Sequence, residues 1–322
     1  MSKKATEGND PRSIPPEKAI DVELILADEL ARGDNALSGV PPVLTHMLAN
    51  SGHTLVSDAI VARIRGMLNS LAAQLLAAKA GSAKPAADTA TLDQLSYALT
   101  SDSVVLSYCY ALAMEAHLSE RLEHRASIDP IISPLMQELI ASDRPGTAEI
   151  AMLALAAQSR FIQSQRRMDL PLSELPAELF HAVIKRWEAI GKGDPALAPS
   201  IAQLKGRYDE GASRIGLLAR LTASMKGGAV AALELEHAGL ALFVSALSTM
   251  AKQPRELAVL ACHERQAARL ALSLRAAGLS PDAIERQFIL LKPADRLPAG
   301  IAAIEPARAA AVLKQAKPRG AF

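Results

Sequence analysis

The sequence predicts an all-α fold built from tandem antiparallel helix pairs. Half of the 322 residues are hydrophobic but only 3% are aromatic, so the core must consist of Ala, Leu, Ile, Val and Met side chains. Apolar residues recur three and four positions apart in one segment after another, which is the spacing of a helix face. No segment alternates over more than a few residues, so no sheet is expected. A HEAT/armadillo-like solenoid and a compact multi-helix bundle both fit these patterns.

The first part of the chain predicts a tail and a helical unit. Residues 1–16 are polar and contain several prolines, which is typical of a disordered tail. The N-terminal helical unit spans 17–80. Its first helix covers 17–32 and ends at Gly33, with an apolar stripe formed by Ile20, Leu24, Ala27 and Ala31. A short helix runs from Pro41 to Leu48. Ser57 then caps a long helix whose buried side holds Ile60, Ile64, Met67, Leu68, Leu71 and Leu75.

A linker over 81–91 separates this unit from a middle helical unit over 92–190. The linker begins Gly-Ser-Ala-Lys-Pro-Ala-Ala-Asp-Thr-Ala, a composition that favours an irregular connection. Prolines and polar caps divide the middle unit into five predicted helices, over 92–99, 102–125, 134–141, 147–167 and 176–190.

The C-terminal helical unit spans 191–317 and precedes a short tail, 318–322. Ser280-Pro281-Asp282 is typical of the cap and first turn of a helix. The predicted helices are 198–225, 229–251, 254–277, 281–291 and 306–315.

A weak internal repeat favours the solenoid. The segment 42–50, Pro-Val-Leu-Thr-His-Met-Leu-Ala-Asn, matches the pattern of 134–142, Pro-Leu-Met-Gln-Glu-Leu-Ile-Ala-Ser. Each is a short helix opened by proline and followed by a longer helix. Any helical protein can produce such matches, so the compact bundle stays open.

Four apolar motifs mark the C-terminal third. They are Gly228-Ala-Val-Ala-Ala-Leu, His237-Ala-Gly-Leu-Ala-Leu-Phe-Val-Ser-Ala-Leu, Arg255-Glu-Leu-Ala-Val-Leu and Arg275-Ala-Ala-Gly-Leu. This stretch resembles the uncharacterised bacterial domain-of-unknown-function family 2336. The resemblance implies a helical-repeat fold and brings no catalytic residues with it.

Composition restricts the class of protein. The net charge of +1 and a pI near 7.8 argue against a dedicated nucleic-acid binder, which usually carries a strong basic excess. Cys109 and Cys262 stand alone in apolar helical patterns, which predicts two buried, reduced thiols rather than a disulfide. The polar N-terminus does not resemble a signal peptide, and the apolar segment 238–251 is too short to span a bilayer. We therefore expect a cytoplasmic protein without a membrane association.

Two Glu-x-x-His motifs are the sharpest candidates for metal binding. Each pair, Glu178 with His181 and Glu234 with His237, would lie on one helix face. Di-metal carboxylate bundles use two such motifs and two further carboxylates, for which Glu115 and Glu149 are available. Glu178 is equally explained by the dipole at a helix N-terminus. Overall we expect no cofactor.

A second possible metal face lies on the helix over 102–125. His117, Glu120 and His124 are spaced three and seven residues apart, so all three would point to the same side. Neighbouring arginines and glutamates make a solvated face with local ion pairs the simpler interpretation.

Five basic residues form a candidate interaction patch: Arg160, Arg166, Arg167, Lys185 and Arg186. Arginines in this density can bind phosphates or an acidic partner. The segment 269–287 has the helix-turn-helix order, but its second helix begins with Pro281, Asp282 and Glu285, the wrong charge for DNA. It therefore predicts a packing hairpin.

Taken together, these patterns favour a non-enzymatic helical scaffold or adaptor with an unknown protein partner. Its most apolar segment, 229–277, could form the interface of a homodimer. A di-metal carboxylate enzyme that uses the two Glu-x-x-His motifs is the first alternative. A regulator that binds nucleic acid is the second.

Overall fold

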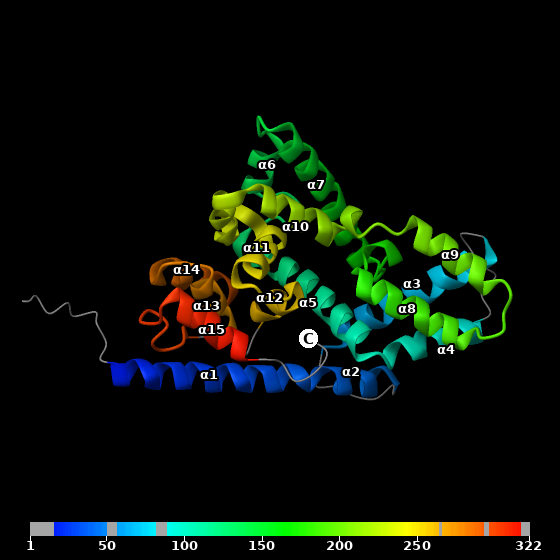
Figure 1. Ribbon diagram of the computed structural model, residues 1–322, viewed down its shortest axis with the longest axis horizontal. Coiled ribbons are helices and arrows are strands. Elements are labelled where there is room, and N and C mark those ends of the chain that lie inside the picture. The colour runs from blue at the N-terminus through cyan, green and yellow to red at the C-terminus, as the bar shows by residue number, and fades with distance from the viewer. Residues whose placement is uncertain (1–15, 50–56, 82–88, 264–265, 293–295, 317–322) are drawn as a thin grey trace, which may run out of the picture.

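The computed structural model describes residues 16–49, 57–81, 89–263, 266–292 and 296–316 (Figure 1). These residues form fifteen α-helices and three short 3-10 helices, and they contain no strand. The prediction of an all-α fold is confirmed. The predicted tail 318–322, the tail 1–16 except for Pro16, and most of the predicted linker lie outside the described residues.

The N-terminal helices are α1 (Pro16–Ser38), α2 (Val40–Ala49), α3 (Asp58–Ala80) and α4 (Thr89–Thr100). The six residues predicted for the inner side of α3 are all buried. The prediction for α1 is wrong in two respects: the helix continues through Gly33, and Leu24 is 64% exposed. A neighbouring apolar stripe is buried instead, formed by Leu26, Leu30 and Leu37. The buried stripe faces α13 (Ala267–Ala276), because Asp34 on that stripe pairs with Arg269 of α13.

The middle of the chain forms four helices and a one-turn 3-10 helix, η1 (Leu172–Glu174). The helices are α5 (Ser103–Ala126), α6 (Pro134–Ile140), α7 (Pro145–Arg166) and α8 (Ala177–Ile190). These bounds agree with the predicted helices. The Asp102 carboxylate caps α5 by accepting from the backbone N–H of Val104 at 3.0 Å.

Helix α5 is central in the molecule, and Figure 1 shows it in the middle of the assembled helices. Most of its residues are buried, and it contacts helices from every part of the chain: α2, α3, α4, α7, α8, α11 (Leu235–Ala251), α12 (Arg255–Ala261) and α14 (Pro281–Leu291). In a solenoid each repeat contacts only its neighbours. The solenoid prediction is therefore not confirmed, and helices packed around one central helix fit the compact bundle better.

The C-terminal third contains more breaks than predicted. Its elements are α9 (Leu197–Arg207), η2 (Glu210–Ala212), α10 (Arg214–Ser224), η3 (Lys226–Leu233), α11 (Leu235–Ala251), α12 (Arg255–Ala261), α13 (Ala267–Ala276), α14 (Pro281–Leu291) and α15 (Pro306–Gln315). The last two match the prediction.

The three long helices predicted over 198–225, 229–251 and 254–277 are wrong, because each is interrupted. In the first, the side chains of Asp209 and Ser213 cap new helical starts at the N–H groups of Gly211 and Gly216. In the second, η3 and α11 meet at an angle of 116° beside Glu234. In the third, α12 ends at Ala261 and α13 begins at Ala267.

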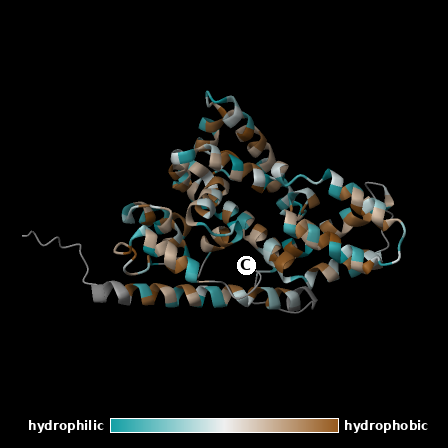
Figure 2. Ribbon diagram, in the orientation of Figure 1, coloured by the Kyte–Doolittle hydropathy of each residue, from teal (hydrophilic) through white to brown (hydrophobic). Residues whose placement is uncertain are grey.

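One continuous hydrophobic core connects the three predicted units. Figure 2 shows that most helices carry both hydrophobic and hydrophilic residues. Contacts of α1 with α13 and of α3 with α9 cross the predicted unit boundaries, which themselves stay predictions. Most large hydrophobic side chains of the segment 229–277 are buried in this core. Among the described residues of the segment, Val230 is the only large hydrophobic residue that is strongly exposed. The possible homodimer interface in this segment stays a prediction.

No single helix in the described parts of the chain is long and apolar enough to cross a membrane. The bent pair of η3 and α11 passes that test together, by length and composition only.

Gly239 allows α11 to approach the start of α6. Its backbone angles, φ 69° and ψ 162°, are accessible almost only to glycine, and a Cβ there would lie 3.2 Å from the Cβ of Ser133. We expect Gly239→Ala to lower the free energy of unfolding by about 1–3 kcal/mol, measured by urea denaturation. Gly227→Ala is the matched control, because a Cβ at Gly227 meets nothing within 4 Å. Equal stability of the two variants would contradict this explanation.

Helix α1 is held partly by buried polar contacts. The carboxylate of Asp34 pairs with Arg269 of α13, and both side chains are more than nine-tenths buried. We expect Asp34→Asn to cost about 3–5 kcal/mol, because it leaves the Arg269 charge buried without its counter-ion. Hydrogen exchange of the α1 amides, with urea denaturation, measures the effect. The control is Asp28→Asn, which removes an exposed ion pair with Arg32 on the same helix. A loss as large in the control would refute the role of Asp34.

Candidate functional site

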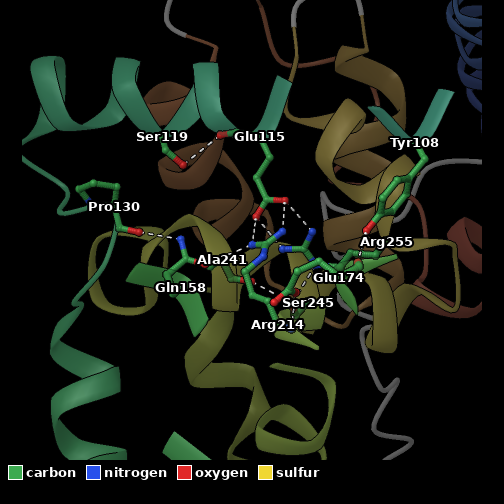
Figure 3. Close-up of polar contacts among 10 residues, drawn as sticks. All are labelled: Tyr108, Glu115, Ser119, Pro130, Gln158, Glu174, Arg214, Ala241, Ser245 and Arg255. Carbon is green, nitrogen blue, oxygen red and sulfur yellow. Dashed lines mark hydrogen bonds and ion pairs between the residues drawn. The ribbon is translucent and has the colours of Figure 1, made fainter. Parts of the chain in front are cut away.

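The most unusual polar feature of the core is one carboxylate held by two arginines (Figure 3). Glu115 lies in the middle of α5, Arg214 begins α10 and Arg255 begins α12. The Glu115 side chain is 1% exposed, and those of Arg214 and Arg255 are 2% and 9% exposed. Three charged groups are therefore taken out of water together.

Both arginines bind the carboxylate through two hydrogen bonds. Arg214 donates to the two oxygens of Glu115 at 2.7 and 2.9 Å, and Arg255 donates to the same two oxygens at 2.7 and 2.7 Å. A carboxylate offers about four acceptor positions, and here all four are occupied. Two-pronged pairing of this kind also fixes the orientation of both guanidinium groups.

Each arginine side chain makes one further hydrogen bond. Arg214 donates to Oε1 of Gln158 at 3.1 Å, and the amide of Gln158 donates in turn to the carbonyl of Pro130. The guanidinium of Arg214 lies 3.7 Å from the centre of the Phe161 ring, a cation–π contact. Arg255 donates through Nε to the hydroxyl of Ser245 at 3.1 Å. These contacts tie α5, α10 and α12 together, and we call the cluster of Glu115, Arg214 and Arg255 the joint.

Electrostatics keeps the joint ionised. Burial alone would raise the pKa of the Glu115 carboxyl, but the charges and hydrogen bonds of Arg214 and Arg255 hold that pKa well below its usual range. Burial would likewise lower the pKa of Arg255, and the attraction of Glu115 raises it instead. The carboxylate therefore remains charged throughout the neutral range and is not suited to acid–base chemistry.

A cavity of about 270 Å³ lies beside the joint, between α7, η1 and α10. Arg214 forms part of its wall, and two exposed arginines, Arg160 and Arg167, lie at its rim. Gln165 also lines it and is 2% exposed, yet its side-chain oxygen has no hydrogen-bond partner among the described residues. The cavity thus has three arginines in its lining and one buried oxygen, Oε1 of Gln165, that accepts no hydrogen bond from a described residue.

The structure brings together only part of the predicted basic patch. Arg160 and Arg167 share the cavity, and Arg166 is exposed at the end of α7 without lining it. Lys185 and Arg186 belong to α8, where Arg186 lies 3.6 Å from Asp102. The rim arginines differ from each other, because Arg167 pairs with Asp169 at 3.1 Å whereas no ion pair of Arg160 is found in the described part of the chain.

The two Glu-x-x-His motifs do not meet. Glu178 and His181 lie in α8, where the His181 ring packs edge-on against Phe180. Glu234 accepts from the amide of Gln287 at 3.0 Å, and His237 lies 3.4 Å from Glu138. Among the described residues no group of three or more His, Cys, Asp or Glu could hold a metal ion. Glu115, considered above as a further ligand, has its acceptor positions filled by arginine.

The other candidates also have structural partners. Glu120 accepts from Arg63 at 2.9 Å, so it serves as an ion-pair partner between α5 and α3, and it forms no metal face with His117 and His124. Helices α13 and α14 pack against each other, as expected of a packing hairpin, and α13 is buried on nearly all sides. Cys109 and Cys262 are both free and buried, as predicted, and burial raises the pKa of each thiol to about 12.

Sequence reasoning missed the joint. Glu115 was considered only as a spare carboxylate, and Arg214 was placed inside a continuous helix. One signal was available: Glu115 is the only charged residue of the apolar stretch 103–116. A lone charge in a buried segment implies a counter-ion, but nothing in the sequence says which of the many arginines supplies it.

No known protein family, curated protein or solved structure matches the chain. The resemblance to family 2336 therefore stays a prediction that rests on the four motifs of the C-terminal third.

The charge of Glu115 stabilises the fold. We expect Glu115→Gln to lower the free energy of unfolding at pH 7 by about 3–5 kcal/mol, since two arginines then lose their counter-ion. The folded pKa of Glu115 is lowered, so its contribution is complete above the unfolded pKa of about 4.3 and is lost as the pH falls further. The difference between parent and variant should accordingly shrink below about pH 4.

Urea denaturation followed by circular dichroism, from neutral to acidic pH, measures this difference. Glu120→Gln is the matched control on the same helix, because its ion pair with Arg63 involves a half-exposed carboxylate. A difference between parent and Glu115→Gln that is small at pH 7, or that does not change with pH, would refute the assignment.

Proposed function

We propose that this protein is a non-enzymatic, cytoplasmic helical scaffold that binds an acidic segment of a partner protein. The observation that carries the proposal is the cavity beside the joint, with Arg160 and Arg167 at its rim and Arg214 in its wall. Arginine is the side chain best suited to bind carboxylates through paired hydrogen bonds.

The balance of charge around the cavity supports an anionic ligand. Two of the three arginines have carboxylate partners, Arg214 with Glu115 and Arg167 with Asp169. Glu174, the other acidic residue of the lining, accepts from the backbone N–H of Arg214 at 2.8 Å. Arg160 forms no ion pair among the described residues, although Asp209 lines a neighbouring hollow with it, so its guanidinium is free to bind a carboxylate from outside.

The size of the cavity favours a protein segment. Pockets that enclose whole small-molecule ligands usually measure about 300–1,000 Å³. A volume of about 270 Å³ is enough for one or two side chains. Nucleic acid is a poorer candidate, since the chain has a net charge of +1 and Phe161, the aromatic residue beside Arg160, has its face covered by Arg214.

Other features are in accord with this proposal. The two buried, free thiols suit a reducing compartment such as the cytoplasm. The described residues offer no metal-binding cluster on which the di-metal alternative could rest. The helical-repeat resemblance to family 2336 is compatible with a scaffold.

The test compares binding by the parent chain and by an Arg160→Glu, Arg167→Glu double variant. A fluorescent peptide of six glutamates serves as the acidic probe, and a peptide of six glutamines is its neutral match. We expect the double variant to bind the acidic probe at least about tenfold more weakly, because two rim charges are reversed. Fluorescence anisotropy at physiological salt gives both affinities.

The matched control reverses two exposed basic residues of α9, in a Lys205→Glu, Arg207→Glu variant. It has the same net charge as the test variant, so it separates the cavity from the overall charge of the chain. Affinity purification of all three chains from the native host then identifies the partner as a protein lost from the test variant alone. Equal binding by test and control variants would refute the proposal.

A further inference from the structure

A second hollow lies near the N-terminal ends of α5, α8 and α12. Its volume is about 470 Å³, and its lining includes Tyr108, which also lines the arginine cavity described above. We propose that this hollow binds a primary ammonium group carried on an alkyl chain.

The charge of the lining has one sign. Glu178, Glu210 and Glu256 contribute to it, and no lysine or arginine does so among the described residues. Two of these glutamates lie in the first turns of α8 and α12, where the helix dipole alone would favour a carboxylate. The helix dipole thus explains the positions of Glu178 and Glu256, but it does not explain why an unpaired hydroxyl group lies in the same lining.

That hydroxyl belongs to Ser107, which lines the hollow and is 2% exposed. Its Oγ has no hydrogen-bond partner among the described residues. Other buried hydroxyls of this protein bond to the carbonyl four residues earlier, as Ser119 does to Glu115 at 2.9 Å and Thr222 to Leu218 at 2.8 Å. A buried hydroxyl without a partner is costly, and an ammonium group would supply the missing donor.

The rest of the lining suits an alkyl chain. It includes Pro176, Leu179 and the half-exposed Val104, together with the ring of Tyr108. The volume is in the range of pockets that enclose small ligands. A divalent metal ion fits less well, because no group of three or more carboxylate, imidazole or thiol ligands in the described parts of the chain could hold one.

A primary ammonium on an alkyl chain has two sources, a free alkylamine and the side chain of a protein lysine. We would titrate the full chain with n-pentylammonium and with Nα-acetyl-lysine methylamide, using saturation-transfer NMR. The neutral match is n-pentanol, which has the same alkyl chain and no charge. We expect saturable binding of at least one amine, and binding of n-pentanol that is at least about tenfold weaker.

Three variants locate the site. We expect a Glu178→Gln, Glu256→Gln double variant to bind the amine at least about fivefold more weakly, and Ser107→Ala to weaken binding by a smaller factor. Ser107→Ala should not lower the stability of the fold, because it removes a hydroxyl that has no partner. Glu188→Gln is the control, since Glu188 is exposed on α8 and does not line the hollow.

The result also distinguishes the two sources. Tighter binding of the blocked lysine supports a lysine of a partner protein, and tighter binding of n-pentylammonium supports a free amine. Absence of saturable binding by both amines, equal binding of n-pentanol, or full affinity in the Glu178→Gln, Glu256→Gln variant would overturn the proposal. The Arg160→Glu, Arg167→Glu variant should retain amine binding, so this site and the acidic-segment site can fail separately.

Discussion

The joint, the ion cluster of Glu115, Arg214 and Arg255, is the constraint on which the arrangement of the helices depends. Removing a carboxylate and two guanidinium groups from water costs several kcal/mol per ion, and only complete pairing can offset that cost. Here the two arginines fill all four acceptor positions of the carboxylate. The starts of α10 and α12 are thereby held against the middle of α5 (Figure 3).

Orientation is as important as attraction in this cluster. Well-packed apolar side chains in the same place could give similar stability, so the presence of charges calls for another explanation. A fork of two hydrogen bonds tolerates little rotation or sliding, whereas leucines can repack in several ways. In a core poor in aromatic residues and rich in alanine and leucine, a fixed polar contact specifies one register of α10 and α12 on α5. We regard this as the reason that a buried glutamate is found in the central helix.

The sequence predicted those parts of the fold whose causes are local. Helices α3 and α14 each have a clear apolar face, and their bounds were close to the prediction. Ser280 caps α14 as predicted, whereas the predicted cap Ser57 precedes α3 without a side-chain capping bond. The prediction was wrong where a distant contact decides the outcome. The sequence around Leu26 does not show that the stripe of Leu26, Leu30 and Leu37 is buried against α13 while Leu24 is exposed. The break at Glu234 lies in an apolar stretch, where helical periodicity hides a change of direction. The break at Ser213 follows a polar stretch, and the capping roles of Asp209 and Ser213 there were missed.

The candidate site could not be predicted, for the same reason. Glu115 finds its partners 99 and 140 residues further along the chain. Of the five basic residues chosen from the sequence, Arg160 and Arg167 line the arginine cavity. The sequence did not indicate Arg214 and Glu174, the two residues that join this cavity to the core. Their contact forms only when η1 packs beside the start of α10.

Contacts of Glu174 and Tyr108 connect the joint of Glu115, Arg214 and Arg255 with the two proposed binding sites. The Glu174 carboxylate accepts from the N–H of Arg214, and its backbone carbonyl accepts from the hydroxyl of Tyr108 at 3.1 Å. Burial raises the pKa of the Tyr108 phenol well above its usual value, so this donor stays protonated. Tyr108 in turn lines both the arginine cavity and the glutamate-lined hollow. The pairing that fixes Arg214 therefore also positions the walls of two hollows with different charge. A variant of Glu115 would disturb all three at once, so only variants at the rims can separate a binding role from a structural one.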